Sequence, residues 1–110
     1  MTSDDFRRLA LALPEAVEQG HMGHPDFRVG GKIFAGLDRS GDRATVKLTP
    51  DQQEVLMSAE PAMFTPCNGA WGMKGWTYVV LGAADAEAAT GALRMAWRNT
   101  APAKLVASTP

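Results

Sequence analysis

Residues 68–82 read N-G-A-W-G-M-K-G-W-T-Y-V-V-L-G and hold two of the three Trp and the only Tyr of the chain. Side chains alternate along a strand, so Trp76, Tyr78 and Val80 share one face and the residues between them share the other. Both faces are largely apolar, which is typical of a central strand covered on at least one side. We expect the rings of Trp76 and Tyr78, and that of Trp97, to fill the core.

Upstream of this strand, glycine recurs at every third position, at Gly69, Gly72 and Gly75. The segment does not contain the order G-x-x-x-x-G-K-[ST] of a phosphate-binding loop. Because glycine permits positive φ angles, a flexible turn is the favoured interpretation, with a dedicated ligand loop as the alternative. Trp71 lies in this turn beside Lys74, and it is the aromatic residue that we expect at the surface.

The N-terminal half predicts one helix followed by antiparallel hairpins. Thr2 or Ser3 caps a helix that Pro14 ends. Gly30-Gly31 is a two-residue turn of the kind that joins hairpin strands. The expected strands are 27–29, 32–37 and 44–48, with a second hairpin tip at 38–43 and a weaker edge strand within 17–23.

Alternation within the strand 32–37 places Ile33, Ala35 and Leu37 on one face. After it, Thr49, Pro50 and Gln52 form the clearest helix start in the chain, a capping box with proline at the first helical position.

The rest of the chain adds both helices and strands to the predicted order. The helix that begins at Pro50 ends before Pro61, and a short strand is expected at 62–65. A last helix starts near Asp85. The chain beyond Asn99 is expected to be frayed, with docking of Leu105 and Val106 as the alternative. The order α-β-β-β-α-β-β-α predicts the α+β class, with an antiparallel sheet of about five strands and flanking helices. A chain of 110 residues is long enough for a single domain, 1–110, with residues 100–110 as its tail.

Composition points to an ordinary globular protein in a reducing compartment. The chain is 45% hydrophobic, its net charge is −1, and it has one cysteine, Cys67. The N-terminus lacks the basic-then-apolar run of a signal peptide, and the sequence has no apolar run near the roughly 20 residues that span a bilayer. We therefore expect a cytoplasmic protein without a membrane partner. An unpaired edge near Val17 would allow a weak dimer as the alternative to a monomer.

Charge is distributed unevenly along the chain. Residues 27–49 carry five basic and two acidic side chains, whereas residues 50–67 carry three acidic side chains and no basic one. Hairpin tips and strands can enter DNA grooves, where Lys and Arg contact phosphates. The alternative is a solvated charged sheet face, and from the residues alone it is the favoured one. The basic residues on or beside the hairpins are Arg28, Lys32, Arg39, Arg43 and Lys47.

The sequence predicts neither catalytic residues nor a metal site. His21 and His24 lack the second pair of ligands that zinc sites usually show. Cys67 with either His would make a nucleophile and a base, but the sequence indicates no third orienting group. We therefore expect no enzyme and no cofactor.

The chain resembles the MmcQ/YjbR-like family over nearly its full length. The resemblance rests on the order and spacing of an N-terminal helix ending at L-P-E, then H-P-D-F-R-V-G-G-K-I-F-A, V-K-L-T-P-D-Q, W-G-M-K-G-W-T-Y-V-V-L and a closing helix. It implies a compact α+β fold and DNA binding through a double-wing arrangement of hairpins. The wings would be the hairpins around Gly30-Gly31 and 38–43. The implied contacts are Arg28, Lys32, Arg39, Arg43, Lys47 and Lys74.

Two functional hypotheses follow. The first is a non-enzymatic protein that binds DNA weakly, largely through phosphates. The second is a small-molecule or protein-interaction module that uses the sheet face and the glycine turn with Trp71.

Overall fold

The computed structural model describes residues 1–21 and 23–109, and of His21 only the backbone. The described helices and strands are α1 Ser3–Leu11, β1 Val17–His21, β2 His24–Val29, β3 Lys32–Leu37, β4 Arg43–Lys47, α2 Pro50–Ala59, β5 Phe64–Pro66, α3 Gly69–Met73, β6 Trp76–Val80, the 3₁₀ turn η1 Leu81–Ala83, α4 Ala86–Thr100 and α5 Ala103–Ala107.

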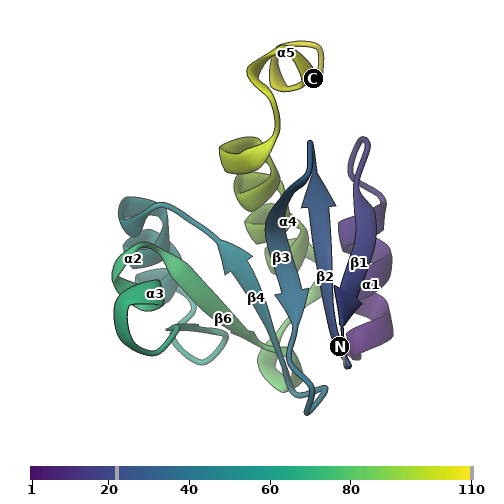
Figure 1. Cartoon of the computed structure of the whole chain (residues 1–110). Coiled ribbons are helices and arrows are strands. Elements are labelled where there is room, and N and C mark those ends of the chain that lie inside the picture. The colour runs from purple at the N-terminus through teal and green to yellow at the C-terminus, as the bar shows by residue number, and fades with distance from the viewer. Residues whose placement is uncertain (22, 110) are drawn as a thin grey trace.

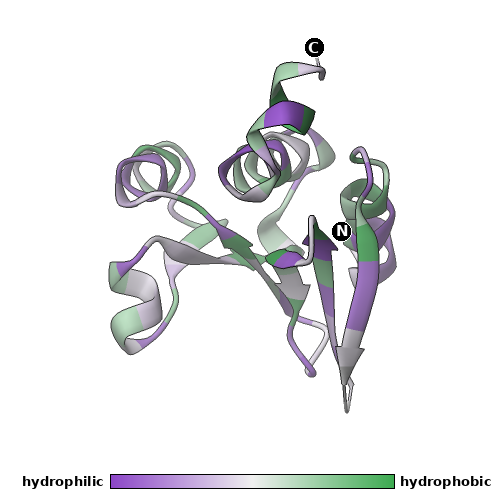
Figure 2. Ribbon diagram, turned by 45° about the horizontal axis from the view of Figure 1, so that its top comes forward, coloured by the Kyte–Doolittle hydropathy of each residue, from purple (hydrophilic) through white to green (hydrophobic). Residues whose placement is uncertain are grey.

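The strands of the described residues form a six-stranded antiparallel sheet in the order β1-β2-β3-β4-β6-β5. Helices α1, α2 and α4 lie on one side of this sheet, and the short helix α3 lies on the other (Figures 1 and 2). One face of the sheet is therefore packed against three helices, and we call the other the open face.

The core lies between the sheet and the long helix α4, which packs on β3 and β4. Trp97 of α4 is 2% exposed, and its Nε1 donates a hydrogen bond to the Pro14 carbonyl at 2.9 Å. The rings of Phe6 and Phe27, both fully buried, contact each other at 6.2 Å between centroids. Trp97 thus fills the core as expected and also ties α4 to the end of the first helical segment.

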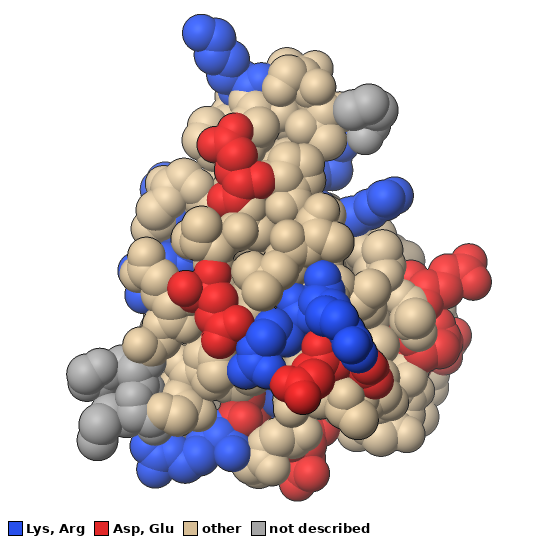
Figure 3. Space-filling view, turned by 90° about the vertical axis from the view of Figure 1, so that its right-hand side faces the viewer, with Lys and Arg blue, Asp and Glu red and all other residues tan. Residues whose placement is uncertain are grey.

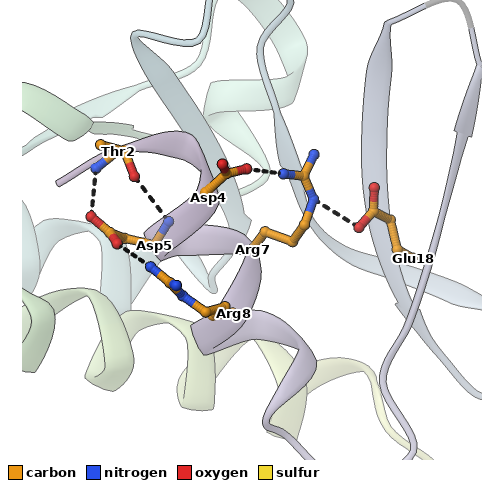
Figure 4. Close-up of polar contacts among 6 residues, drawn as sticks. All are labelled: Thr2, Asp4, Asp5, Arg7, Arg8 and Glu18. Carbon is orange, nitrogen blue, oxygen red and sulfur yellow. Dashed lines mark hydrogen bonds and ion pairs between the residues drawn. The ribbon is translucent and has the colours of Figure 1, made fainter.

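Helix α1 is fixed at its start and along its exposed side (Figure 4). Thr2 accepts from the Asp5 backbone, and the Asp5 carboxylate accepts from the Thr2 backbone, which makes a capping box. Arg7 pairs with Asp4 in the same helix and donates to Glu18 of β1 at 2.9 Å. The second ion pair joins the helix to the edge strand.

A β-bulge in β3 changes which side chains face the core. Phe27 pairs with Ala35 and Arg28 pairs with Ile33, so Phe34 has no partner in β2. Phe34 and Ala35 are consecutive, yet both are fully buried. The prediction that Ile33 shares a face with Ala35 and Leu37 is wrong, because the extra residue turns Ile33 to the open face.

The α+β class, the antiparallel sheet and the capping box at Thr49 and Gln52 are confirmed. The weak edge strand is also confirmed as β1, so the sheet has six strands instead of about five. The expected frayed tail is wrong, since residues 103–107 form α5. The alternative is confirmed, because Leu105 and Val106 pack against the core.

The expected glycine turn is also wrong as a flexible segment, because residues 69–73 form helix α3. Gly75 has a φ of 109°, and a Cβ added there would lie 2.0 Å from the Leu48 carbonyl oxygen. At Gly72 an added Cβ would lie 1.9 Å from the Cys67 carbonyl oxygen. These glycines let the backbone of α3 and its exit approach neighbouring backbone closely.

We predict that Gly75→Ala lowers the free energy of unfolding by about 2–4 kcal/mol, because the new methyl group overlaps backbone atoms at a positive φ. Gly91→Ala is the matched control, since Gly91 lies inside α4 with open space around it. That change should raise stability by up to about 1 kcal/mol through helix propensity. Urea unfolding followed by circular dichroism measures both. Equal effects of the two changes would contradict the packing described for Gly75.

Candidate functional site

The open face carries one continuous row of cross-strand partners. Asp26 of β2 lies opposite Gly36 of β3, Gly36 opposite Thr45 of β4, and Thr45 opposite Tyr78 of β6. Residues opposite each other in antiparallel strands point to the same face. This row is the floor of a cleft on the side of the sheet that α1 and α4 leave uncovered.

The cleft has a volume of about 440 Å³ and is walled mainly by aromatic and apolar groups. Trp76 and Tyr78 project from β6, and Trp71 projects from α3. Pro25 and Ile33 close the opposite side, and Ile33 is there because of the bulge in β3. Ligand sites are typically concave and largely apolar with a few polar groups, and this cleft has that character.

Two of the aromatic rings of the cleft lie nearly at right angles to each other. Trp71 and Trp76 meet edge to face, with 6.0 Å between ring centroids and 80° between ring planes. Trp71 is 62% exposed, which confirms the expectation that it lies at the surface. The expectation that Trp76 and Tyr78 fill the core is wrong. Both are half-buried and line the cleft, because the core face of β6 belongs to Thr77 and Val79.

Helix α3 is held in place from beneath by Gln53 of α2. The Gln53 amide nitrogen donates to the carbonyl oxygens of Gly72 and Trp76 and to the Thr77 hydroxyl, each at 3.1 Å. Thr77 in turn donates to the Gly75 carbonyl at 2.8 Å. The wall that carries Trp71 is therefore fixed to α2 and β6 by buried hydrogen bonds.

The predicted basic residues are divided between the two faces of the sheet. Arg28, Arg43 and Lys47 lie on the open face by their strand register, and the Lys74 ammonium lies 5.7 Å from the centre of the Trp71 ring. Lys32 pairs with Val29, which is buried in the core, so Lys32 lies on the helix-covered face.

Two of the arginines on the open face have acidic partners. Arg28 donates to Asp26 at 2.8 and 3.2 Å. Arg43 donates to Asp38 at 3.1 and 3.2 Å, and its guanidinium stacks 3.9 Å from the centre of the Tyr78 ring. Hydrogen bonding from Arg43 lowers the pKa of Asp38, so this pair stays ionised at neutral pH.

The two hairpin tips that the resemblance implies as wings lie at opposite ends of the sheet. Strand β3 connects them and is six residues long, so the tips are roughly 20 Å apart. The Gly30 tip also packs on the C-terminal segment, since a Cβ added at Gly30 would lie 2.9 Å from the Pro102 ring. Arg39, at the other tip, lies near Gly23 of the turn between β1 and β2. The predicted contacts therefore do not form one cluster at the tips.

Acidic and basic groups are also mixed elsewhere on the surface. On the side that carries α1 and β1, blue and red groups lie next to one another (Figure 3). This pattern agrees with the near-neutral net charge and provides no single basic face on that side.

Family models and solved structures place this fold among known proteins. The YjbR family model matches residues 11–99, which include the cleft. The chain belongs to the YjbR family.

Among solved structures, the chain is similar to the crystal structure of Deinococcus radiodurans protein DR2400, whose domain is DUF419. The two chains are 28% identical with a TM-score of 0.74, over 89% of this chain and 77% of that one. The curated proteins include no match to the chain.

Cys67 and His24 both line the cleft, but the pair does not have the character of a nucleophile and its base. Burial raises the pKa of the Cys67 thiol to about 11, and the charge of Arg43 offsets this only in part. A nucleophilic cysteine needs a lowered pKa instead. Within the described residues, no three His, Cys, Asp or Glu side chains gather closely enough to hold a metal ion. The side chain of His21, which entered the sequence-based metal hypothesis, lies outside the described residues.

Among the residues that the structure describes, no helix combines the length and the apolar character needed to cross a bilayer.

Several residues of the site were not singled out from the sequence. Gln53 is polar and lies in the middle of a helix, where polar residues usually face solvent. Thr45 points to the open face, but nothing in its own strand indicates that it lies on the floor of a cleft. A glycine inside a strand, as at Gly36, is a usable signal, since it often marks close approach of a ligand or another backbone.

We predict that Cys67 in the folded protein reacts slowly with iodoacetamide at pH 8. Raising the thiol pKa from 9.0 to about 11 lowers the thiolate fraction about 100-fold. The same chain unfolded in urea is the control and should react as an ordinary cysteine. The rate for the folded protein should climb steadily with pH towards 11. A folded-state rate at pH 8 equal to the unfolded one would contradict the raised pKa of Cys67.

Proposed function

We propose that this chain is a non-enzymatic nucleic-acid-binding protein that holds bases of a single DNA strand in the open-face cleft. The observation that carries the proposal is a set of three aromatic rings, from Trp71, Trp76 and Tyr78, that line a cleft on an otherwise uncovered sheet face. Every base has a flat π-face, and proteins that bind single strands present aromatic side chains on which successive bases stack.

The charges around the cleft support the same proposal. Arg43, Lys47 and Lys74 lie on the open face or beside Trp71, near the aromatic rings. A strand that stacks its bases in the cleft passes its phosphates near these cations. When a Lys or Arg side chain binds a phosphate, counterions condensed on the nucleic acid are released. Asp26 and Asp38 offset part of the positive charge, so binding is expected to be weak and to depend strongly on stacking.

This proposal differs from groove entry by two wings. Tips that are roughly 20 Å apart, with one packed on the Pro102 ring, favour the sheet face over the tips as the contact surface. The proposed contacts to the nucleic acid still include Arg28, Arg43, Lys47 and Lys74. Lys32 lies on the other face and is not included.

A second candidate function is binding of a free small molecule with a flat ring. It is favoured by the volume of the cleft, about 440 Å³, which is within the usual range of 300–1,000 Å³ for small-molecule sites. Free nucleoside monophosphates distinguish the two functions. If the cleft holds only one ring, a nucleoside monophosphate would bind as tightly as an oligonucleotide. If neighbouring nucleotides contribute to binding, the monophosphate would bind more weakly than the oligonucleotide.

We predict that Trp71→Ala weakens binding of fluorescein-labelled oligothymidylate about 5- to 150-fold, because stacking on an aromatic side chain is worth about 1–3 kcal/mol per base. Fluorescence anisotropy at low salt measures the affinity. Met73→Ala is the matched control, since Met73 is 83% exposed on the same helix and does not line the cleft. Equal affinities for wild type and Trp71→Ala would refute stacking in the cleft. Tighter binding of a duplex than of the single strand would favour the winged-hairpin hypothesis instead.

We further predict that Lys47→Glu weakens the same binding and reduces the slope of log affinity against log salt by about 0.7, the value for one phosphate contact to a single strand. Lys32→Glu makes the same change of charge on the opposite face and should leave the slope unchanged. Titrations at several salt concentrations measure both slopes. A larger effect at Lys32 would show that the nucleic acid does not follow the open face.

A further inference from the structure

We infer that Thr45 and Asn68 discriminate between bases, with Gly36 providing the space through which the edge of a base reaches them. The inference rests on the proposed binding of single-stranded DNA and adds specificity to it. Its basis is a strand-interior glycine and two polar side chains that line one cleft and have no hydrogen-bond partner among the described residues.

Gly36 lies inside β3, between partners in β2 and β4. Glycine weakens a strand through its backbone entropy and provides no side chain to pack. Its φ is not in the positive region, so the backbone does not require glycine there. A Cβ at this position would point to the open face, 3.2 Å from the Thr45 Oγ1 and 3.5 Å from the Pro25 carbonyl oxygen. A Cβ there would crowd this hydroxyl, so the missing side chain leaves the Thr45 hydroxyl room at the floor of the cleft.

The same distance places the Thr45 hydroxyl directly beside this opening. Thr45 is half-buried, and its hydroxyl oxygen is within reach of solvent in the cleft. Within the described residues, no side chain or carbonyl group serves as its hydrogen-bond partner. The hydroxyl is both a donor and an acceptor, so it is available to a ligand that enters over Gly36.

Asn68 approaches the cleft from the side of α3. It occupies the N-cap position of that helix, where an Asn side chain normally accepts a hydrogen bond from the first turn, yet it makes no such bond. The residue is exposed, and it lines the cleft with Trp71. A side-chain amide has a donor and an acceptor next to each other. The amide thus has no hydrogen-bond partner within the described residues, and it borders the stacking surface.

The chemistry of the amide indicates which base is preferred. Asn pairs bidentately with adenine, because N7 accepts and the N6 amino group donates at neighbouring positions. The Thr45 hydroxyl lies on the floor of the same cleft and provides a further donor or acceptor. We therefore expect adenine to be held more tightly than thymine when a single base is exchanged at the centre of an oligothymidylate.

The experiment measures the ratio of affinities for two labelled single strands, an oligothymidylate and the same strand with one central adenine. The wild-type protein should prefer the adenine strand about 5-fold or more. In Asn68→Ala and Thr45→Val the ratio should fall towards one, while binding of the plain oligothymidylate changes little. A ratio near one in the wild type, or a ratio that Asn68→Ala leaves unchanged, would overturn the inference.

The controls separate this inference from the proposed function. Trp71→Ala should weaken both strands by the same factor and keep the ratio. Gly36→Val should fill the floor and remove the preference, while a circular dichroism spectrum like that of the wild type shows that the strand still forms. If neither strand binds wild-type protein at low salt, the proposed function fails as well. If both bind equally and Trp71→Ala weakens them equally, only the base discrimination is wrong.

Discussion

The side-chain amide of Gln53 is the interaction on which the arrangement of the open face depends. One nitrogen lies 3.1 Å from the carbonyl oxygens of Gly72 and Trp76 and from the Thr77 hydroxyl, and so links α2, α3 and β6 at one buried point. An amide has two N–H groups, so one of them is shared between two acceptors. Buried carbonyl groups need partners, and without this amide the backbone of α3 would lose one of its anchors. The position of Trp71, and with it the outline of the cleft, follows from a residue that the cleft itself does not expose.

Most of the fold could be predicted from the sequence because its signals are local. The capping box at Thr49 and Gln52, the hairpin at Gly30-Gly31 and the apolar stripe of α4 each depend on residues close in the chain. The helix α3 was missed for the opposite reason. Its glycines suggest a turn, but Gly75 is required by close contact with the backbone at Leu48, which is distant in the sequence.

The candidate site was predicted only in part. Trp71 and Lys74 were correctly placed together at the surface, because a Trp in a glycine-rich segment has little around it in which to be buried. The faces of the neighbouring strands could not be predicted. Alternation indicates two faces, but it does not say which of them the helices cover, and a single bulge at Phe34 reverses the alternation in β3. The basic residues were found by type, but their distribution over two faces and two ends depends on register.

The fixed position of α3 has a consequence for the ligand selectivity of the cleft. A wall tied down by buried hydrogen bonds and backbone contact does not close around a guest, so little conformational entropy is lost on association. Selection then occurs by fit to an existing outline, and association rates are limited by orientation rather than by rearrangement. In evolutionary terms, the selectivity of such a cleft would change through replacement of the residues that line it, one at a time.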